Sequence, residues 1–416
     1  MFTIIYGLII ALYCYDPKIA IIPLLAVIIM TIITKEELPN KIISVLILLL
    51  PFSSCNILLN GVSSLFSLFD LVLYFYFIFC IITGKIKKDK INFLAVFLII
   101  YTTIKFLTAK YQSLSFFTSI SIIVMLFTIL TSNSTFKFKV DTDMLIKKYI
   151  EVGISSSFAL IISYFLYKRG ITIGNVTVFG NSASNIRINF NLLYTSYSYL
   201  SAYLASCAVA LLSYCGVLRL KLSDIIKLLI LIIGILISSS RTGLVVILLL
   251  TMFMYIKTIN FKKLTIHQII IPVVAIFIVA ICWHIITTLR PETVKFFSDF
   301  GRFERWNYAL AIFKEYPIVG YGFYNDKNVL PLAHNFILEY LSEGGIIFLF
   351  SFVCLLFEFI KRIKENKYKY ILYAILLSNL FFTCLHENKF MYVIIIILLL
   401  ENKGKEDSIE WRKSEY

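Results

Sequence analysis

The stretch that decides the fold reads "LLILIIGILISSSRTGLVVILLLTMFMYI" and occupies residues 228–256. It contains 29 residues and a single charge, Arg241. As one helix it would extend about 43 Å at about 1.5 Å per residue, well beyond the roughly 30 Å hydrocarbon core of a bilayer. It would also leave Arg241 near the bilayer centre, at a cost of at least about 2.5 kcal/mol. We therefore predict two helices joined by a turn at "SSSRTG", where the arginine reaches the membrane surface.

The rest of the chain is equally apolar. Hydrophobic residues make up 60% of the 416 residues and charged residues 15%, with a mean hydropathy of +0.89. A soluble domain would carry about 25% charged residues, and the alternation typical of a β-barrel is not visible. We predict an all-α polytopic membrane protein with about 12–14 transmembrane helices in a single domain, residues 1–416. The predicted spans are 2–14, 19–34, 42–57, 62–83, 91–108, 113–131, 149–167, 191–216, 222–238, 242–257, 266–288, 335–358, 370–385 and 390–400.

The basic residues predict which side of the membrane each loop occupies. A turn at 238–243 places 25 of the 39 Lys and Arg residues on one side, whereas a single long helix would divide them almost evenly. The positive-inside rule assigns the richer side, with both termini, to the cytoplasm. The intervals 168–190, 238–242, 289–334 and 386–389 then face outward. The net charge of +15 is a topology signal on this interpretation, and we expect no nucleic-acid partner.

The N-terminal segment and the cysteines exclude two kinds of processing or function. The apolar segment 2–14 lacks a basic n-region before it and a small-residue cleavage site after it, so we expect no cleavable signal peptide. The eight cysteines lie in or beside apolar runs and form no CxxC pair. We therefore expect no metal site and no redox function for them.

The outward loop 289–334 is predicted to contain an amphipathic helix over 299–315. Apolar residues at i, i+3, i+7 and i+10 form one stripe along it, namely Phe303, Trp306, Leu310 and Phe313. Such a helix is expected to lie in the membrane interface. Pro317 ends it and "GYG" at 320–322 supplies a turn. Arg302 and Arg305 flank the stripe three residues apart, so both are expected to reach the same spot.

Three blocks in fixed order resemble a known family. They are "SSSRTG" (238–243), "GRFERWNYALAIFKEYPIVGYG" (301–322) and "HNFILEYLSEGGI" (334–346). Together they resemble the O-antigen ligase/polymerase superfamily over residues 225–360, although Thr242 stands where glycine or alanine is usual. The resemblance implies a GT-C-like glycosyltransferase of the bacterial inner membrane that works at the periplasmic face without metal or cofactor. The substrates implied are glycans linked to undecaprenyl pyrophosphate, with membrane lipid and a chain-length regulator protein as further partners.

The resemblance also suggests site residues. Arg241 matches the turn arginine, Arg302 the arginine of an Arg-x3-aromatic motif, His334 the histidine, and Glu343 with Gly344 the Glu-Gly pair. Arginine binds phosphate oxygens in a bidentate manner, which suits a pyrophosphate leaving group. A neutral histidine at a helix start suits a base that deprotonates a sugar hydroxyl.

Two more arginines and two supporting residues complete the predicted site. Arg305 is added on geometry alone, and Arg187 in "NIRINF" is a second-tier binder of phosphate or glycan. Asn335 and Glu343 are expected to support the site.

Each of these residues also has a plainer interpretation. Asn335 is a good N-cap for a membrane helix, beside an interfacial His334. Arg241 could anchor to lipid head groups, and Arg302 with Arg305 could form the solvated face of the amphipathic helix. Glu343 could be structural, and the outward-facing His386 is a rival base.

The preferred function is an O-antigen or capsule repeat-unit polymerase. The alternative is the ligase, which uses the same donor but transfers the glycan to lipid A-core. A flippase for lipid-linked sugars is a lesser alternative, because the chain lacks the internal repeats typical of transporters.

Overall fold

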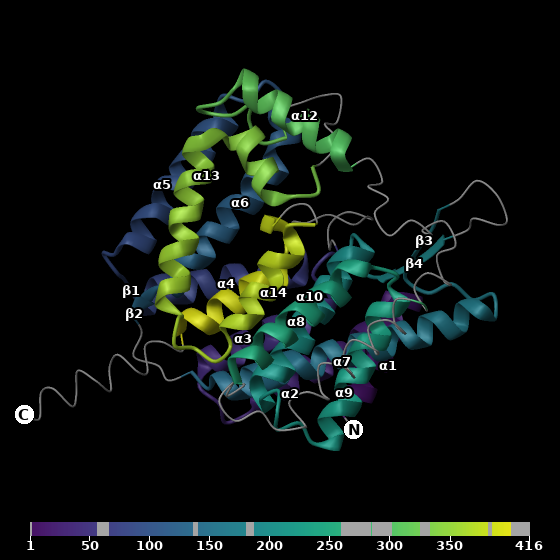
Figure 1. The fold of residues 1–416 in the computed structure, drawn as a ribbon. Coiled ribbons are helices and arrows are strands. Elements are labelled where there is room, and N and C mark those ends of the chain that lie inside the picture. Colours follow the sequence, from purple (N-terminus) through teal and green to yellow (C-terminus); the bar gives the residue numbers. More distant parts are fainter. Residues whose placement is uncertain are drawn as a thin grey trace, which may run out of the picture. The chain divides into compact units, whose positions relative to one another are not determined.

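A computed structural model of the chain describes residues 2–55, 66–135, 140–179, 187–258, 284, 302–324, 333–381 and 385–400. These residues divide between two compact units, which we describe separately. Unit 1 comprises Met1–Ile33, Ile146–Ser298 and Tyr373–Ser378. Unit 2 comprises Thr34–Leu145, Asp299–Leu372 and Asn379–Tyr416. Helices dominate both units (Figure 1).

The helices of unit 1 are α1 (Phe2–Tyr15), α2 (Pro17–Ile33), α8 (Tyr197–Cys215), α9 (Leu222–Ile237) and α10 (Arg241–Thr258). Those of unit 2 are α3 (Leu38–Leu49), η1 (Leu50–Phe52), α4 (Leu68–Thr83), α5 (Lys90–Leu107), α6 (Gln112–Ser132), α12 (Arg302–Glu315), α13 (Phe336–Arg362), η3 (Leu385–Glu387) and the helix Lys389–Leu400. Helices α7 (Thr142–Lys168) and α14 (Lys369–Asn379) have residues in both units. Six of the described helices are long and apolar enough to cross a membrane. The protein is an all-α polytopic membrane protein, as the composition predicted.

The turn predicted from the opening stretch is present. Helix α9 ends at Ile237 and α10 begins at Arg241, so "SSS" separates two helices. Ser238 Oγ donates to the Ile235 carbonyl at 2.7 Å, and Ser239 adopts a left-handed φ of 61°. Beyond the turn, a Cβ added at Gly243 would lie 2.3 Å from Ser201 Oγ on α8. The small residue therefore lets α10 pack directly against α8, as in many membrane helix pairs.

One predicted span begins too early. The span 191–216 starts as helix α8 only at Tyr197, because residues 187–192 form a strand. Strands β3 (Asn175–Phe179) and β4 (Arg187–Leu192) pair antiparallel with a bulge near Asn175. The segment "RINFNL" alternates polar and apolar residues, which is the period of a strand rather than of a helix. The hairpin lies in the interval predicted to face outward, and Ser239 Oγ donates to the Ile188 carbonyl at 3.1 Å.

In unit 2, helices α5, α6 and α13 pack together, and α12 packs on α13 (Figure 1). Asp89 caps the start of α5, and Arg362 near the end of α13 bonds it, so we name this region the Asp89 end. The short strands β1 (Lys85–Ile86) and β2 (Ser134–Thr135) pair there. The opposite end of α13, with α12 and the C-terminal turns of α5, is named the His334 end.

A buried ion pair joins the helix Lys389–Leu400 to α4. Lys389 Nζ lies 2.6 Å from Asp70 Oδ2 and donates to the Ser53 carbonyl at 2.7 Å. Both side chains are buried, at 6% and 2% exposure. The sequence presents 386–389 as a polar loop and gives no sign of this burial, because the partners are more than 300 residues apart.

Candidate functional site

Helix α12 places two arginines beside the start of α13. The Arg305 guanidinium hydrogen-bonds Nε2 of His334. One residue later on α12 and one residue earlier on the segment before α13, Trp306 Nε1 donates to the Ala333 carbonyl at 2.8 Å. These two adjacent contacts hold α12 against residues 333–334. The helix expected over 299–315 is present from Arg302 to Glu315. Residues 299–301 lie outside the described part of the chain.

The exposure of side chains along α12 departs from the single apolar stripe predicted from the sequence. Phe303 and Leu310 are exposed at 58% and 39%, as expected for side chains that meet lipid. Ala309 is buried against the protein, and Arg305 and Trp306 are half-buried on that same side. The interaction with residues 333–334 therefore takes Arg305 out of the solvated face that a plain amphipathic helix would give it.

The backbone at His334 is held in an unusual conformation. His334 has a φ of 52°, which is uncommon for a residue with a side chain. The next residue, Asn335, is the N-cap of α13, and its Oδ1 accepts from the amides of Ile337 and Leu338 at 3.0 and 3.2 Å. The N-cap interpretation of Asn335 is thus confirmed. The cap fixes where the helix begins and so fixes the position of the histidine before it.

The surroundings of His334 keep its ring neutral. Burial, followed by the charges of Arg305 and Arg302, lowers the pKa of His334 from 6.5 to about 4. The prediction that both arginines reach one spot is consistent with this effect. Because a guanidinium only donates, Nε2 of His334 must act as the acceptor, and the ring proton resides on Nδ1. The site therefore contains a neutral imidazole beside two positive charges.

A loop interrupts α13 just after its second turn. Gly345 has φ 71° and ψ −176°, which breaks the helix between Glu343 and Ile346. The turn at 317–322 occupies the break. Tyr321 N and Gly322 N donate to the carbonyls of Ser342 and Glu343 at 3.0 and 2.8 Å. In return, the amides of Ile346 and Ile347 donate to the carbonyls of Pro317 and Ile318 at 3.0 and 3.3 Å. The backbone groups freed by the break are thus satisfied inside the protein, as a membrane segment requires.

Glycine is required on both sides of this contact. A Cβ at Gly320 would lie 2.3 Å from the Glu343 carbonyl oxygen, and one at Gly345 would lie 2.4 Å from Gly320 N. Helix α5 supports the turn, because Lys105 Nζ donates to the Gly320 carbonyl and Tyr101 donates to the Gly344 carbonyl, at 2.9 and 2.8 Å. The sequence predicted a continuous span over 335–358 and missed the break. The "GYG" and "EGG" signals were both visible, but their mutual contact was not.

Glu343 takes part in the same junction. Its Oε1 accepts from the Tyr324 amide at 3.4 Å, and its carbonyl accepts from Gly322. Among the described residues its partners are thus backbone amides of the turn. This geometry fits the supporting role suggested for Glu343 better than a direct role in chemistry.

The other predicted arginines belong to unit 1. Arg241 is half-buried and is the first residue of α10. A basic residue there is disfavoured by the helix dipole, but the same helix end attracts anions. Arg187 begins β4 and pairs with Phe179, and Ser239, two residues before Arg241, bonds this strand. The structure thus brings the turn and the start of β4 together. The meeting of Arg241 with His334 of unit 2 in one pocket stays a prediction.

The rival base is enclosed. His386 is 2% exposed, and its Nδ1 lies 3.4 Å from the Tyr340 hydroxyl. Burial lowers the pKa of His386 to about 3. A substrate hydroxyl has no access to a ring enclosed in this way, so His334 is the better candidate.

Residues 226–353 match the family model described as O-antigen ligase. Over this segment the chain is similar to the O-antigen ligase/polymerase superfamily. The matched segment contains Arg241, the whole of α12, His334 and the break in α13, whereas Arg187 lies outside it. No curated protein and no solved structure matches the chain. This similarity suggests a glycosyltransferase-like enzyme that acts on lipid-linked glycan in a membrane.

Proposed function

We propose that the chain is an O-antigen or capsule repeat-unit polymerase with His334 as its base. The observation that carries the proposal is a neutral histidine bonded to an arginine, fixed by the cap of α13 and located within the segment matched by the family. The enzyme would move a growing glycan from undecaprenyl pyrophosphate to the terminal sugar of a lipid-linked repeat unit. It would work in the bacterial inner membrane at the periplasmic face, with both termini in the cytoplasm.

The reaction assigns a task to each group. The acceptor hydroxyl attacks the anomeric carbon of the donor sugar, and its proton passes to Nε2 of His334. The bond between that carbon and the phosphate oxygen breaks, and undecaprenyl pyrophosphate leaves as an anion. Arg302 and Arg305 stabilise its charge, and Arg241 and Arg187 are the further arginines predicted to bind the pyrophosphate. Charged bidentate contacts of this kind are worth most where they meet charge that develops in the transition state.

Arg305 has two successive partners in this scheme. In the present structure its guanidinium donates a hydrogen bond to Nε2 of His334, the atom that must accept the proton in the proposed reaction. Pyrophosphate oxygens are stronger acceptors than a neutral imidazole, so donor binding would draw the guanidinium away. The phosphate charges would also offset those of Arg302 and Arg305, which lower the pKa of His334. Donor binding would thus expose the base and raise its basicity together.

Replacement of His334 by alanine tests the proposal in cells. We expect surface glycan reduced to single repeat units, because the donor is still made and exported but is not polymerised. His284→Ala, which changes an exposed histidine that has no task in the proposed reaction, serves as the matched control and should keep normal chain lengths. Normal chain lengths in His334→Ala would remove the assignment of the base.

The ligase is the second candidate, since the matching family model is described as O-antigen ligase. It shares the donor chemistry and differs in the acceptor, lipid A-core. Its loss would remove surface glycan altogether while lipid-linked polymer accumulates, so the same mutant separates the two functions. Polymerisation of a defined lipid-linked repeat by the purified protein in EDTA tests the expected independence from metal.

A further inference from the structure

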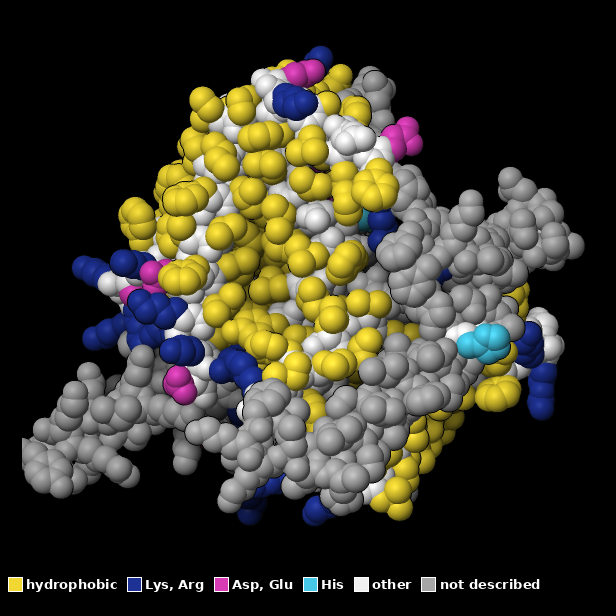
Figure 2. Space-filling view, viewed as in Figure 1, with side chains coloured by type: hydrophobic (Ala, Val, Ile, Leu, Met, Phe, Trp, Pro, Cys, Tyr) yellow, Lys and Arg dark blue, Asp and Glu magenta, His cyan; other side chains and the backbone are white. Residues whose placement is uncertain are grey.

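The Asp89 end of unit 2 contains a groove that the proposed reaction does not use. It has a volume of about 660 Å³ and lies along the start of α5. Lys87, Lys88 and Lys90 line its polar side. A second groove of about 370 Å³ shares Lys90 and extends to Lys361 and Arg362 of α13. Figure 2 shows the dark-blue cluster of basic side chains at the position of β1 and β2 in Figure 1.

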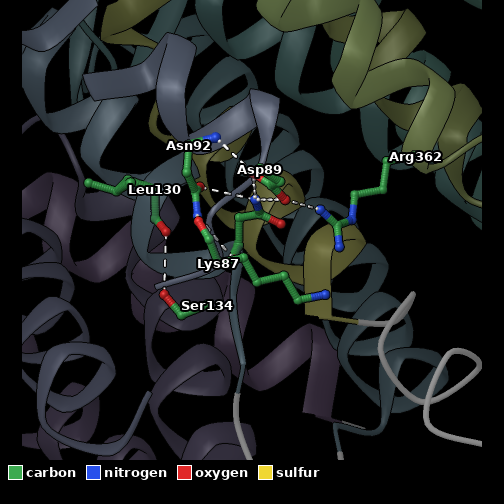
Figure 3. A network of polar contacts seen from close by, with 7 residues as sticks. Lys87, Asp89, Asn92, Leu130, Ser134 and Arg362 are labelled. Atoms are coloured by element: carbon green, nitrogen blue, oxygen red, sulfur yellow. Dashed lines mark hydrogen bonds and ion pairs between the residues drawn. The ribbon is translucent and has the colours of Figure 1, made fainter. Parts of the chain in front are cut away.

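The Asp89 carboxylate, which lines both grooves, is fully engaged in contacts within the protein. Asp89 accepts from Asn92 N at 3.0 Å and from Asn133 Nδ2 at 2.9 and 3.0 Å, and Arg362 bonds it at 2.8 Å (Figure 3). These bonds engage both carboxylate oxygens, and Arg362 offsets the charge. Lys90 Nζ also lies 3.9 Å from a carboxylate oxygen of Glu358 in the second groove. The basic residues of the two grooves nevertheless outnumber these two carboxylates, so the grooves carry net positive charge.

The opposite wall of the groove is apolar and faces outward from the bundle. Phe93 and Val96 are 71% and 40% exposed, although both belong to α5, a helix apolar enough to cross a membrane. Their exposed side chains are suited to contact acyl chains. The groove thus places basic side chains at the helix start and an apolar surface one to two turns further along.

We propose that this groove binds an anionic phospholipid. The head-group phosphate would lie among Lys87, Lys88 and Lys90, and the acyl chains would follow Phe93 and Val96 along α5. Lysine near a membrane surface attracts anionic lipid, and an amphiphile satisfies both walls at once. A soluble acidic peptide would leave the apolar wall uncovered. In the topology predicted from the basic residues, the lipid belongs to the cytoplasmic leaflet.

Lipid retention by the full chain tests the proposal. The purified protein is incubated in detergent with equal amounts of dioleoyl phosphatidylglycerol and dioleoyl phosphatidylcholine, and bound lipid is counted by native mass spectrometry. We expect the wild type to retain phosphatidylglycerol selectively. The triple variant Lys87→Gln/Lys88→Gln/Lys90→Gln should lower the ratio of the two lipids about fivefold or more. Lys88→Gln alone, which alters an exposed side chain, should lower it about twofold and serves if the triple variant does not fold.

The control removes the same charge elsewhere. Lys110→Gln/Lys168→Gln/Lys314→Gln changes three exposed lysines outside the groove and should keep the wild-type ratio. Equal loss in both triple variants, or equal retention of the two lipids by the wild type, would overturn the proposal. Full competition by glycerol 3-phosphate would assign the groove to a free phosphate. Displacement of the lipid by hexaglutamate, but not by sodium chloride of the same ionic strength, would assign it to an acidic peptide.

Discussion

Helix α13 has an arginine contact near each of its ends, and the two contacts differ in kind. At the Asp89 end, Arg362 bonds a carboxylate at 2.8 Å, within a network that also caps α5. At the His334 end, Arg305 bonds a neutral imidazole. The first arrangement pairs opposite charges and stabilises the fold. The second places positive charge against a group that must stay neutral, which suits an anionic substrate more than it suits stability.

The two ends also respond to acid through different groups. Burial acts to raise the pKa of Asp89. Hydrogen bonds from Asn92 and Asn133, together with the hydrogen bond and charge of Arg362, outweigh it, so this pKa lies below its ordinary value. Its stabilisation is present at neutral pH and is lost as pH falls through the folded-state pKa. His334 also has a lowered pKa, so the unfolded chain takes up this proton first. Its contribution to stability therefore falls between about pH 6.5 and pH 4.

The largest expected effect separates the two arginines by activity. Arg305→Gln and His334→Gln should each lower turnover about 100-fold, because in the proposed reaction each removes a group that acts on the transition state. Arg362→Gln should keep turnover per folded molecule within about threefold, since its partner is structural. Turnover of a lipid-linked repeat, normalised to folded protein, provides the measurement. Similar losses for Arg305→Gln and Arg362→Gln would erase the distinction.

The backbone at the His334 end gives the next effect. Gly345→Ala should destabilise the protein by about 3 kcal/mol or more, because it combines a strained backbone with a clash against the turn at 317–322. Gly170→Ala is the matched control. Gly170 has φ 80° but no atom within 4 Å of an added Cβ, so strain alone should cost about 1 kcal/mol. Thermal unfolding in detergent compares them, and equal losses would show that the contact with the turn contributes nothing.

Removing the charge pair at the Asp89 end should change the stability of the protein and not its activity. Asp89→Asn keeps a good N-cap residue and removes the charge opposite Arg362, so we expect a loss of about 1–3 kcal/mol. Lys367→Gln removes an exposed pair with Asp143 and should change stability by less than about 0.5 kcal/mol. Denaturation midpoints in one detergent measure both. A loss in Asp89→Asn no larger than in Lys367→Gln would contradict a structural role for the network.

The smallest expected effect is a shift in pH dependence. The acid limb of kcat/KM reports the pKa of the base in the free enzyme, which is about 4 for His334. If His334 is the base, the limb should therefore lie near pH 4. Arg305→Gln removes a neighbouring charge and raises the pKa of His334, so the limb should move up toward pH 6.5. Residual activity would then be lost at a higher pH than in the wild type. Arg362→Gln should leave the limb in place. An unmoved limb in Arg305→Gln would separate the titration from this histidine.

Local pattern was enough for several structural elements around the predicted site. The turn before Arg241 followed from the length of one apolar stretch against the thickness of a bilayer. The spacing of Arg302 and Arg305 put both on one side of a helix, and Asn335 was visible as a cap. The hairpin β3–β4 was not predicted, because residues 191–192 of β4 continue into an apolar helical run, although "RINFNL" shows period 2. The buried pair of Lys389 with Asp70 could not be found, since nothing local marks either residue as buried.

The sequence by itself determined a helical membrane protein and the turn between α9 and α10, while the residues assigned to glycosyl transfer stay a prediction from the resemblance. These depend on hydrophobic length, charge and turn chemistry, which act over a few residues. Only the tertiary structure decided that Arg305 bonds His334, that Arg362 neutralises Asp89, and that the turn at 317–322 fits into the break at Gly345. Each of these contacts joins separate segments, so its energy depends on the packing that brings the segments together.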